Sequence, residues 1–301
     1  MLSMLQRSLL AMAALALSTS GCAGVLVDLG LGAERGRADL RWQRDDDGVV
    51  FLERDVRDPV GTVLMVHGLG GSKDHWTRFC ARLPQNLRLI AVDLPGFGES
   101  PKDPQASYSS AAQVARLKRF VDVHGLHDVH LMGNSMGGRI ATEFALTYPD
   151  DVRSLVLFDP AGVTPPPGSK DNHIVIVRSA ADFQALLATA FVQPPRFPDF
   201  LLSYFAERAQ ENAALESKVV DELNATPGKL EERLGALRPT TLVVWGAEDH
   251  IIDPAAAAVW RATLREGDVV TMAQVGHAPM LERPEESAAL VAVWWRRRGI
   301  L

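Results

Sequence analysis

A serine between closely spaced glycines is the residue of this chain that is best placed for nucleophilic chemistry. The stretch Gly133-Asn134-Ser135-Met136-Gly137 follows an apolar, strand-like run and leads into a helix-like run. A tight turn of this kind needs glycine two residues before and two residues after the serine, because a Cβ there would collide with a neighbouring element. The pattern predicts a strained strand–turn–helix that exposes the Ser135 hydroxyl beside a helix N-terminus, which favours negative charge.

A serine hydroxyl needs a base, and the base needs a carboxylate that orients it. In the chain order serine, acid, histidine, both partners lie downstream of Ser135. His277 follows the last strand-like run, and Asp249 lies in the loop after the strand before it. We therefore interpret His277 as the base and Asp249 as the acid. The rival carboxylates by position in the chain are Glu248, Asp253 and Asp159.

Attack by Ser135 on a carbonyl would form an oxyanion that needs two aligned donors. The backbone N–H of Met136, directly after the nucleophile, is the first expected donor. The second is expected from the glycine-rich loop after the strand over 62–66, where Leu69 offers its N–H. His67 in the same loop is interpreted as a structural residue that bonds neighbouring loops.

The elements that must position these residues alternate between strands and helices. Two strands over 38–44 and 49–55 flank a strong turn signal, Asp45-Asp46-Asp47-Gly48, and predict a hairpin. Further strands are predicted over 62–66, 87–92, 129–132, 154–158, 241–245 and 269–274, and helices over 75–83, 109–124, 136–148, 254–265 and 285–297. Strands alternating with helices predict parallel βαβ units, and therefore an α/β fold.

The alternation stops between residues 160 and 237, where prolines and helix-like runs replace the strands. We interpret 160–237 as a helical cap inserted into a core formed by 38–159 and 238–301. Large apolar side chains gather in this insertion: Phe183, Leu186, Leu187, Phe191, Phe197, Phe200, Leu201, Leu202, Tyr204 and Phe205. Most are expected to pack the cap onto the sheet, and a few to line an acyl pocket, since ligand sites are mostly apolar.

The N-terminus has the composition of an export signal. Residues 1–21 carry a basic residue, an apolar run too short to span a bilayer, and then small residues before Cys22. The pattern resembles a bacterial lipoprotein signal, which predicts a lipid on Cys22 and a membrane anchor; an ordinary secretory signal is the alternative. Residues 22–37 are interpreted as a tether. Lipidation would leave Cys80 without a disulfide partner, as a buried apolar residue.

Composition excludes several classes of function. The chain has 301 residues, 47% of them hydrophobic, and a formal net charge of −6. Basic residues cluster only at Arg296-Arg297-Arg298, so nucleic acid is not expected as a partner. Neither cysteine has a metal-ligand neighbour at a useful spacing, and the chemistry assigned to Ser135 requires no metal and no organic cofactor.

Several of these motifs resemble the α/β-hydrolase superfamily. The resemblance rests on Ser135, Asp249 and His277 in that order, on His67-Gly68, and on the turn Asp93-Leu94-Pro95-Gly96-Phe97-Gly98-Glu99-Ser100. It covers about 60–159 and 238–298. It implies an eight-stranded, mostly parallel sheet with a helical cap after the sixth strand.

The superfamily hosts many reactions, so the fold alone does not settle the function. The segment Leu157-Phe158-Asp159-Pro160-Ala161-Gly162 resembles secreted bacterial lipases, and lipases and monoacylglycerol lipases also fit an exported enzyme. We therefore predict a serine carboxylesterase or lipase. Asn134 matches C–C bond hydrolases of ring-cleavage products, but Ala278 stands where those enzymes commonly carry tryptophan. A hydrolase-fold binding protein with little turnover is the other alternative.

Overall fold

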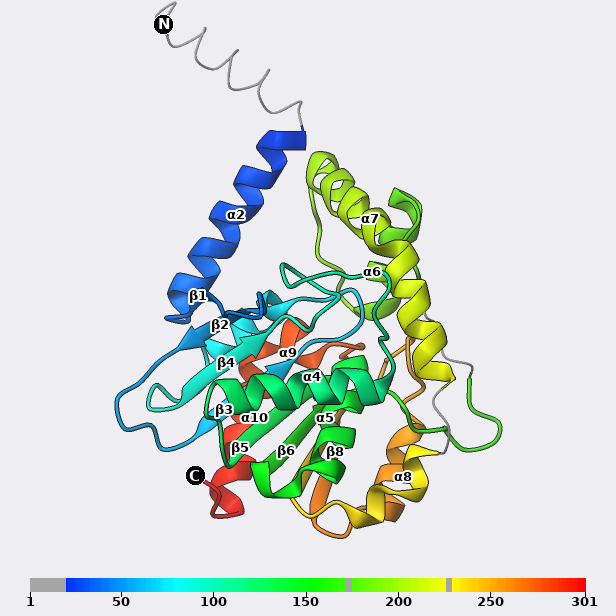
Figure 1. Ribbon diagram of the computed structural model, residues 1–301. Helices are drawn as coiled ribbons and strands as arrows, with labels where there is room; N and C mark the ends of the chain where they lie inside the picture. Colours follow the sequence, from blue (N-terminus) through cyan, green and yellow to red (C-terminus); the bar gives the residue numbers. More distant parts are fainter. Residues whose placement is uncertain (1–19, 171–174, 226–228) are drawn as a thin grey trace, which may run out of the picture.

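The centre of the fold is an eight-stranded sheet (Figure 1). The computed structural model describes residues 20–170, 175–225 and 229–301. The strands are β1 (Arg41–Arg44), β2 (Val50–Arg54), β3 (Thr62–Val66), β4 (Arg88–Val92), β5 (Val129–Asn134), β6 (Val152–Phe158), β7 (Thr240–Gly246) and β8 (Gly267–Met272). They lie in the order β1-β2-β4-β3-β5-β6-β7-β8.

The direction of the strands divides the sheet into two parts. β1, β2 and β4 pair antiparallel, whereas the pairs from β4 through β8 are all parallel. The central strands are buried over almost their whole length, which is why they read as continuous apolar runs. The carboxyl ends of the parallel strands share one edge, so the loops that follow them meet there. The prediction of an eight-stranded, mostly parallel α/β-hydrolase sheet is confirmed.

Helices cover both faces of the sheet. They are α3 (Thr77–Cys80), α4 (Ser110–Val123), α5 (Met136–Thr147), α8 (Ala256–Thr263), α9 (Pro279–Glu282) and α10 (Pro284–Arg297), with 3-10 turns η1 (Lys73–Trp76) and η2 (Pro149–Asp151). Side chains of α4, α5 and α8 join one hydrophobic core, and those of α3, α9 and α10 join the other. Figure 1 shows α4 and α5 over one face of the sheet and α10 behind it.

The buried cysteine behaves as predicted from the sequence. Cys80 at the end of α3 is fully buried, and its Sγ lies 3.5 Å from Sδ of Met65 in β3. Burial raises the pKa of the Cys80 thiol to about 12, so it stays protonated. It therefore packs as a small apolar residue.

The insertion between β6 and β7 is helical, as predicted. It contains α6 (Ala180–Ala190), α7 (Asp199–Asn224) and the short turns η3 (Leu230–Glu232) and η4 (Leu234–Ala236). Figure 1 shows α6 and α7 above the end of the sheet that carries the loops. Contacts from α7 hold the cap on the core: Lys218 donates to the carbonyl oxygens of Pro104 and Ala106 at 2.7 and 2.8 Å.

The segment interpreted as a tether has regular structure. Residues Ser20–Arg37 form helix α2, and its upper end meets the start of α7 (Figure 1). A Cβ added to Gly24 would lie 3.5 Å from the Tyr204 ring, and Arg35 binds Asp74 in η1 at 2.7 Å. No helix was predicted here from the sequence, because helix propensity is low where glycines recur. Contacts with the folded domain support the helix instead.

The proposed export signal lies mostly outside the described residues, which begin at Ser20. Among the helices of 20–170, 175–225 and 229–301, none combines the length and the apolar composition needed to cross a bilayer.

Candidate active site

The turn between β5 and α5 holds Ser135 in a strained conformation. Its φ and ψ are 54° and −119°, outside the regions that residues with a side chain normally occupy. Two hydrogen bonds fix the turn to the next strand: Ser135 N donates to Phe158 O at 3.0 Å, and Ala161 N donates to Ser135 O at 3.0 Å. Strain of this kind persists only where the surroundings determine the backbone, as they do here.

The glycines on either side of the serine are required by close backbone contacts. A Cβ on Gly133 would lie 2.3 Å from the carbonyl oxygen of Gly137. A Cβ on Gly137 would lie 2.4 Å from the carbonyl oxygens of Val66 and His67, at the end of β3. The helix α5 therefore approaches β3 more closely than any side chain would permit.

His277 and Asp249 lie in direct contact. Nδ1 of His277 and Oδ2 of Asp249 are 2.7 Å apart, and the Asp249 side chain is fully buried. Asp249 Oδ1 also accepts from the backbone N–H groups of Ile251 and Ile252, at 2.7 and 3.0 Å. Three donors hold this carboxyl group and fix its orientation. With Nδ1 engaged, Nε2 of His277 is the nitrogen left for chemistry.

The loops that carry these two residues are bonded to each other and to the elbow. Glu248 N donates to Val275 O at 3.0 Å, which joins the acid loop to the histidine loop. Nδ2 of Asn134, the residue before the nucleophile, donates to His277 O at 3.2 Å. His277 N in turn donates to Ala190 O, at the end of α6, at 2.8 Å. The structure thus brings the serine turn, the histidine loop and the cap to one edge of the sheet.

The rival carboxyl groups occupy different places. Glu248 is exposed, and Asp253 accepts from Lys170 N and Ala255 N at 2.6 and 2.9 Å. Asp159 is fully buried at the end of β6, where its Oδ1 accepts from Gly246 N at 2.8 Å. Of the rivals, only Asp159 shares the site with the pair Asp249–His277.

Two free amides lie next to the serine. Met136 is the first residue of α5, where backbone N–H groups have no partner within the helix. Leu69 follows Gly68, whose added Cβ would lie 3.2 Å from the Cβ of Ser135. Within the described part of the chain, neither the Met136 amide nor the Leu69 amide has an intramolecular acceptor. Both amides therefore remain candidates for the oxyanion donors predicted from the sequence.

His67 ties the same loop to its neighbour. Leu94 N donates to His67 Nε2 at 3.2 Å, so Nδ1 carries the proton and donates to Gly68 O at 2.7 Å. Burial lowers the pKa of His67 and keeps the ring neutral. This arrangement agrees with the structural role that the sequence indicated.

The turn over 93–100 is braced by a buried carboxylate. Asp93 accepts from Lys73 N at 2.6 Å, Lys73 Nζ at 3.0 Å and Glu99 N at 2.8 Å. Ser100 Oγ donates to Asp93 O at 2.7 Å and accepts from Val50 N at 2.8 Å. These bonds connect η1, β2 and the turn, and they stiffen the loop that lies beside the glycine-rich segment.

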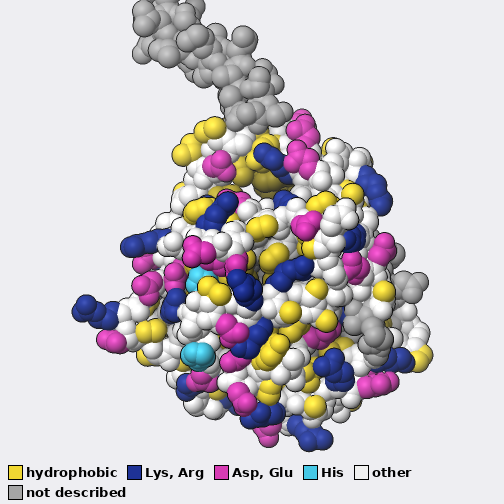
Figure 2. Space-filling model, viewed as in Figure 1, with side chains coloured by type: hydrophobic (Ala, Val, Ile, Leu, Met, Phe, Trp, Pro, Cys, Tyr) yellow, Lys and Arg dark blue, Asp and Glu magenta, His cyan; other side chains and the backbone are white. Residues whose placement is uncertain are grey.

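The cap leaves its large apolar side chains only partly covered. None of the ten apolar residues predicted to gather there is fully buried, and Phe200 is 38% exposed. Several meet through their rings, with centroids of Phe197 and Phe205 5.1 Å apart. Figure 2 shows hydrophobic side chains in a hollow near the top of this face, where α2 and α7 converge. An apolar surface of this kind is suited to a hydrocarbon ligand.

Glu216 on α7 was not predicted from the sequence to lie near the site. Its side chain is 8% exposed, and a Cβ added to Gly70 would lie 3.2 Å from its Oε1. Glu216 shares the buried stripe of α7 with Val219 and Leu223. A carboxyl group in an otherwise apolar helical stripe was the signal available in the sequence. The cap thus places an acidic group against the glycine-rich loop.

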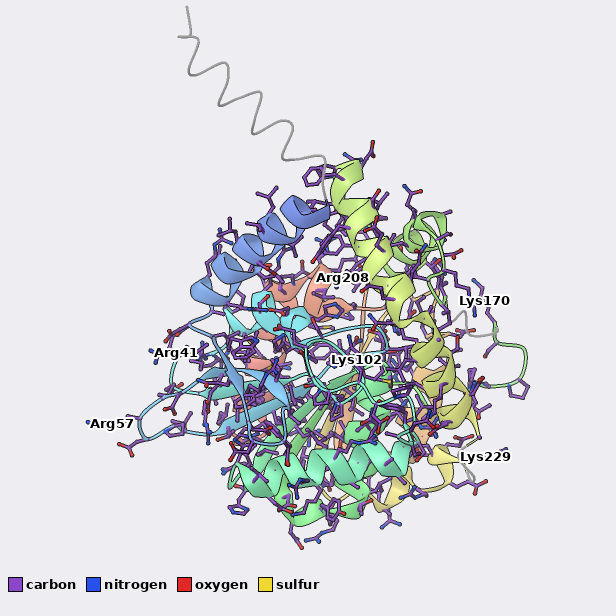
Figure 3. All side chains as sticks on the ribbon, turned by 45° about the horizontal axis from the view of Figure 1, so that its top comes forward. Arg41, Arg57, Lys102, Lys170, Arg208 and Lys229 are labelled. Atoms are coloured by element: carbon purple, nitrogen blue, oxygen red, sulfur yellow. The ribbon has the colours of Figure 1, made fainter. Side chains whose placement is uncertain are left out.

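Burial dominates the electrostatics of Glu216. It raises the pKa of this carboxyl group to about 7, while the charge of Lys102, on the loop after β4 (Figure 3), lowers it by less. Glu216 is therefore largely protonated at mildly acidic pH and ionised at alkaline pH.

One group of side chains in the described residues has the proximity of a metal site. Asp159, Asp249 and His277 offer ligand atoms within 4.8 Å of one another. However, His277 Nδ1 already bonds Asp249, and two backbone donors occupy the other oxygen of Asp249. This set of donors fits a hydrogen-bonded relay better than a metal ion.

Comparison with known proteins identifies the family. The model of the Alpha/beta hydrolase family matches residues 63–290, and the chain belongs to this family. Lipase 1 of Psychrobacter immobilis is 34% identical over 272 residues, which cover 85% of this chain and 84% of that protein. Monoacylglycerol lipase abhd6-A of Xenopus laevis is 30% identical over 248 residues, covering 76% of this chain and 74% of that protein.

A solved structure is similar over nearly the whole chain. The crystal structure of a membrane phospholipase A, described as a novel bacterial virulence factor, has a TM-score of 0.87 and 36% identity. The similarity covers 96% of this chain and 95% of that one. These relatives are named for the hydrolysis of lipid esters, in agreement with the class of enzyme predicted from the sequence.

The raised pKa of Glu216 predicts a pH-dependent stability. The pKa of this group is about 7 in the folded chain and 4.5, the ordinary value, in the unfolded chain. Between about pH 4.5 and 7 the folded chain therefore keeps a proton that the unfolded chain has already released. The free energy of unfolding therefore falls as the pH rises through this window. Glu216→Gln lacks this proton, so the free energy of unfolding of the variant minus that of the parent should be about 2 kcal/mol larger at pH 8 than at pH 5.

Urea unfolding at pH 5 and pH 8 measures this difference. Glu207→Gln on the exposed side of α7 is the matched control and should show no such change. An equal effect of Glu216→Gln at both pH values would contradict a raised pKa.

Proposed function

We propose that this chain is a serine hydrolase of carboxylic esters that works through an acyl-enzyme intermediate. The main support for this proposal is that three features lie at the same edge of the sheet. Ser135 is held in a strained turn, and two free amides lie next to it. His277 and Asp249, whose Nδ1 and Oδ2 atoms are 2.7 Å apart, lie in loops at the same edge of the sheet, where Asn134 binds the carbonyl oxygen of His277. Together they supply a nucleophile, an oriented base and donors for an oxyanion.

In this mechanism the Ser135 hydroxyl attacks the ester carbonyl while Nε2 of His277 removes its proton. Asp249 holds the imidazole in the tautomer that has Nε2 free, and its negative charge stabilises the imidazolium that forms. His277 then protonates the departing alcohol. In the second half of the reaction it activates a water molecule, which attacks the acyl-enzyme and releases the acid.

The oxyanion forms in both halves of the reaction. The amides of Leu69 and Met136 are the donors that we assign to it, because both lack an acceptor within the described residues. The N-terminus of α5 adds a favourable electrostatic field at the same point. Removing one donor of this kind typically lowers kcat by about 10²- to 10³-fold.

The substrate that we propose is an acyl ester such as an acylglycerol. The partly exposed apolar side chains of α6 and α7 support an acyl-binding surface beneath the cap. The names of the relatives, which include lipases and a monoacylglycerol lipase, support the same class. Hydrocarbon burial supplies binding energy of about 0.8 kcal/mol per CH₂, so longer acyl chains are expected to lower KM.

Ser135→Ala should remove hydrolysis of a p-nitrophenyl ester, with a loss in kcat of at least about 10⁴-fold. The nucleophile disappears, while the fold stays intact because the alanine fits the same turn. Turnover is measured with esters of increasing chain length, and circular dichroism checks folding.

Ser203→Ala, at an exposed position on α7, is the matched control and should keep full activity. Retained ester turnover in Ser135→Ala would refute the assignment of the nucleophile. A dienone ring-fission product cleaved faster than any ester would favour a C–C hydrolase. Failure of a fluorophosphonate to label Ser135 would favour a binding protein.

Asp249→Asn should lower kcat by about 10⁴-fold, because the amide favours the wrong tautomer of His277. KM should change little, since Asp249 is buried behind the histidine and does not reach the substrate. Steady-state kinetics of this variant and of the exposed neighbour Glu248→Gln test the assignment. An active Asp249→Asn variant would show that another carboxyl group serves as the acid.

We further propose that the N-terminal segment is an export signal and that Cys22 carries a lipid. The proposal is supported by the short apolar run and the small residues before Cys22. The exposed apolar side chains of Val25, Leu26 and Leu29 on α2 are consistent with a position near a bilayer. Cleavage before Cys22 would leave nearly all of α2 in the mature protein.

Intact mass of the protein from the membrane fraction should correspond to a chain that begins at Cys22 with a diacylglycerol thioether. Cys22→Ala should abolish this modification and release the protein from the membrane fraction, because a lipid anchor supplies the attachment. A free N-terminus at another residue would instead indicate an ordinary secretory signal.

A further inference from the structure

A second buried carboxyl group lies beside the acid–base pair, and the reaction above gives it no part. Asp159, Asp249 and His277 each offer an atom within 4.8 Å of the other two. Asp159 is fully buried, and its φ is 45°, in the left-handed region that residues other than glycine seldom adopt. Since such a conformation persists only where its surroundings enforce it, the fold holds this side chain in a defined place.

The hydrogen bonds of the two carboxyl groups are unequal. Asp249 accepts from three donors, which are Ile251 N, Ile252 N and His277 Nδ1. Hydrogen bonds donated to a carboxylate favour its charged form. Asp249 is therefore the member of the pair that is better suited to carry the negative charge.

Among the described residues, Asp159 accepts from one donor. Its Oδ1 accepts from Gly246 N at 2.8 Å, and its buried Oδ2 has no donor among the described residues. A buried oxygen without a donor is unfavourable as part of a carboxylate, but it is satisfied if it carries a proton and donates. A carboxylate oxygen of Asp249 lies within 4.8 Å of a carboxyl oxygen of Asp159, and Asp249 is therefore the acceptor that we consider.

We propose that Asp159 is a protonated carboxylic acid whose Oδ2–H donates to Asp249, and that it thereby positions the acid of the triad. The inference rests on the proposed assignment of Asp249. Ionising both of two buried carboxyl groups within 4.8 Å is unfavourable, so we assign one proton to the pair. The inequality of donors assigns that proton to Asp159.

The electrostatic surroundings of Asp159 agree with a neutral group. Burial raises its pKa well above the ordinary value of 3.8, and the charge of Asp249 raises it further. The Gly246 amide lowers the pKa, and Glu282 on α9 adds a smaller upward effect. The charged or titratable groups around Asp159 are therefore Asp249, His277 and Glu282, and two of the three are acidic.

The bond from Asp159 has a specific consequence for the reaction. A carboxylate has about four lone-pair sites, so Asp249 can accept a fourth donor. The added donor fixes the rotation of the Asp249 carboxylate toward His277 and keeps Asp249 ionised while the imidazolium forms. Asp159 acts through Asp249 and does not touch the substrate, so it is a positioning residue.

Asp159→Asn and Asp159→Ala separate this role from its alternatives. The asparagine amide can accept from Gly246 N and donate to Asp249, as the protonated acid does, whereas alanine does neither. Asp159→Ala should lower kcat by about 10- to 100-fold, the range found when an outer hydrogen-bond partner is removed at metal sites, with KM retained. Asp159→Asn should recover most of that loss.

The pH profile of kcat/KM for an aryl ester, from pH 5 to pH 9, reports the charge of Asp159. If Asp159 is neutral, Asp159→Asn leaves the midpoint of the acid limb unchanged. If Asp159 is a carboxylate, the substitution removes a negative charge close to the base, and the midpoint falls by about one pH unit or more. That fall would overturn the proposal, and so would an Asp159→Asn variant as inactive as Asp159→Ala.

Two further variants distinguish this proposal from the function on which it depends. Retained turnover in Ser135→Ala, or in Asp249→Asn, would refute the proposed triad itself. With both of those variants inactive, the result for Asp159→Asn bears on Asp159 alone. If Asp159→Ala does not fold, the acid limb of Asp159→Asn still decides whether the native carboxyl group is charged.

Discussion

The backbone of the turn at Ser135 is the constraint on which the rest of the site depends. Its positive φ is maintained by hydrogen bonds to Phe158 and Ala161, so the end of β6 fixes the serine as much as β5 does. The glycines around it allow α5 to approach β3 within a distance that no Cβ would permit. This close packing brings the helix N-terminus and the glycine-rich loop to the same point, where the amides of Met136 and Leu69 that we propose as oxyanion donors lie.

The cap is connected to the carboxyl edge of the sheet through the loop that carries His277. The amide of His277 donates to the last carbonyl group of α6, and Glu282 accepts from both Gly276 N and Gln193 N at 2.8 Å. His277 is therefore held by the cap through its backbone amide and by Asp249 through its side chain. A change in the position of α6 would therefore act on the backbone of His277 as well as on the apolar surface of the cap.

Buried carboxyl groups in this molecule differ according to their donors. Asp93 and Asp249 each accept several hydrogen bonds, which compensate for the loss of water around a charge. Asp159 has one donor, and burial raises its pKa. Burial raises the pKa of Glu216 in the same way, beside Gly70. These buried carboxyl groups thus differ in the number of their donors as well as in their burial.

The amino-acid sequence by itself determined the sheet, its parallel strands and the positions of the candidate residues. Continuous apolar runs such as Thr62–Val66 indicate strands buried on both faces, and glycines around Ser135 indicate a sharp turn, because both signals are local. The order of serine, acid and histidine followed from loops at the ends of successive strands. These features were predictable since they depend on residues that are neighbours in the chain.

Only the tertiary structure decided which groups share an environment. It gave the segment after Cys22 a helical form through contacts with α7 and η1, and it placed Glu216 against the glycine-rich loop. It also distinguished the surroundings of Asp249 and Asp159, which the sequence offered as rivals: Asp249 binds His277, and Asp159 binds the amide of Gly246. Their burial and their donors come from residues far apart in the chain, and the charge of a buried group depends on that complete surrounding, which no local pattern contains.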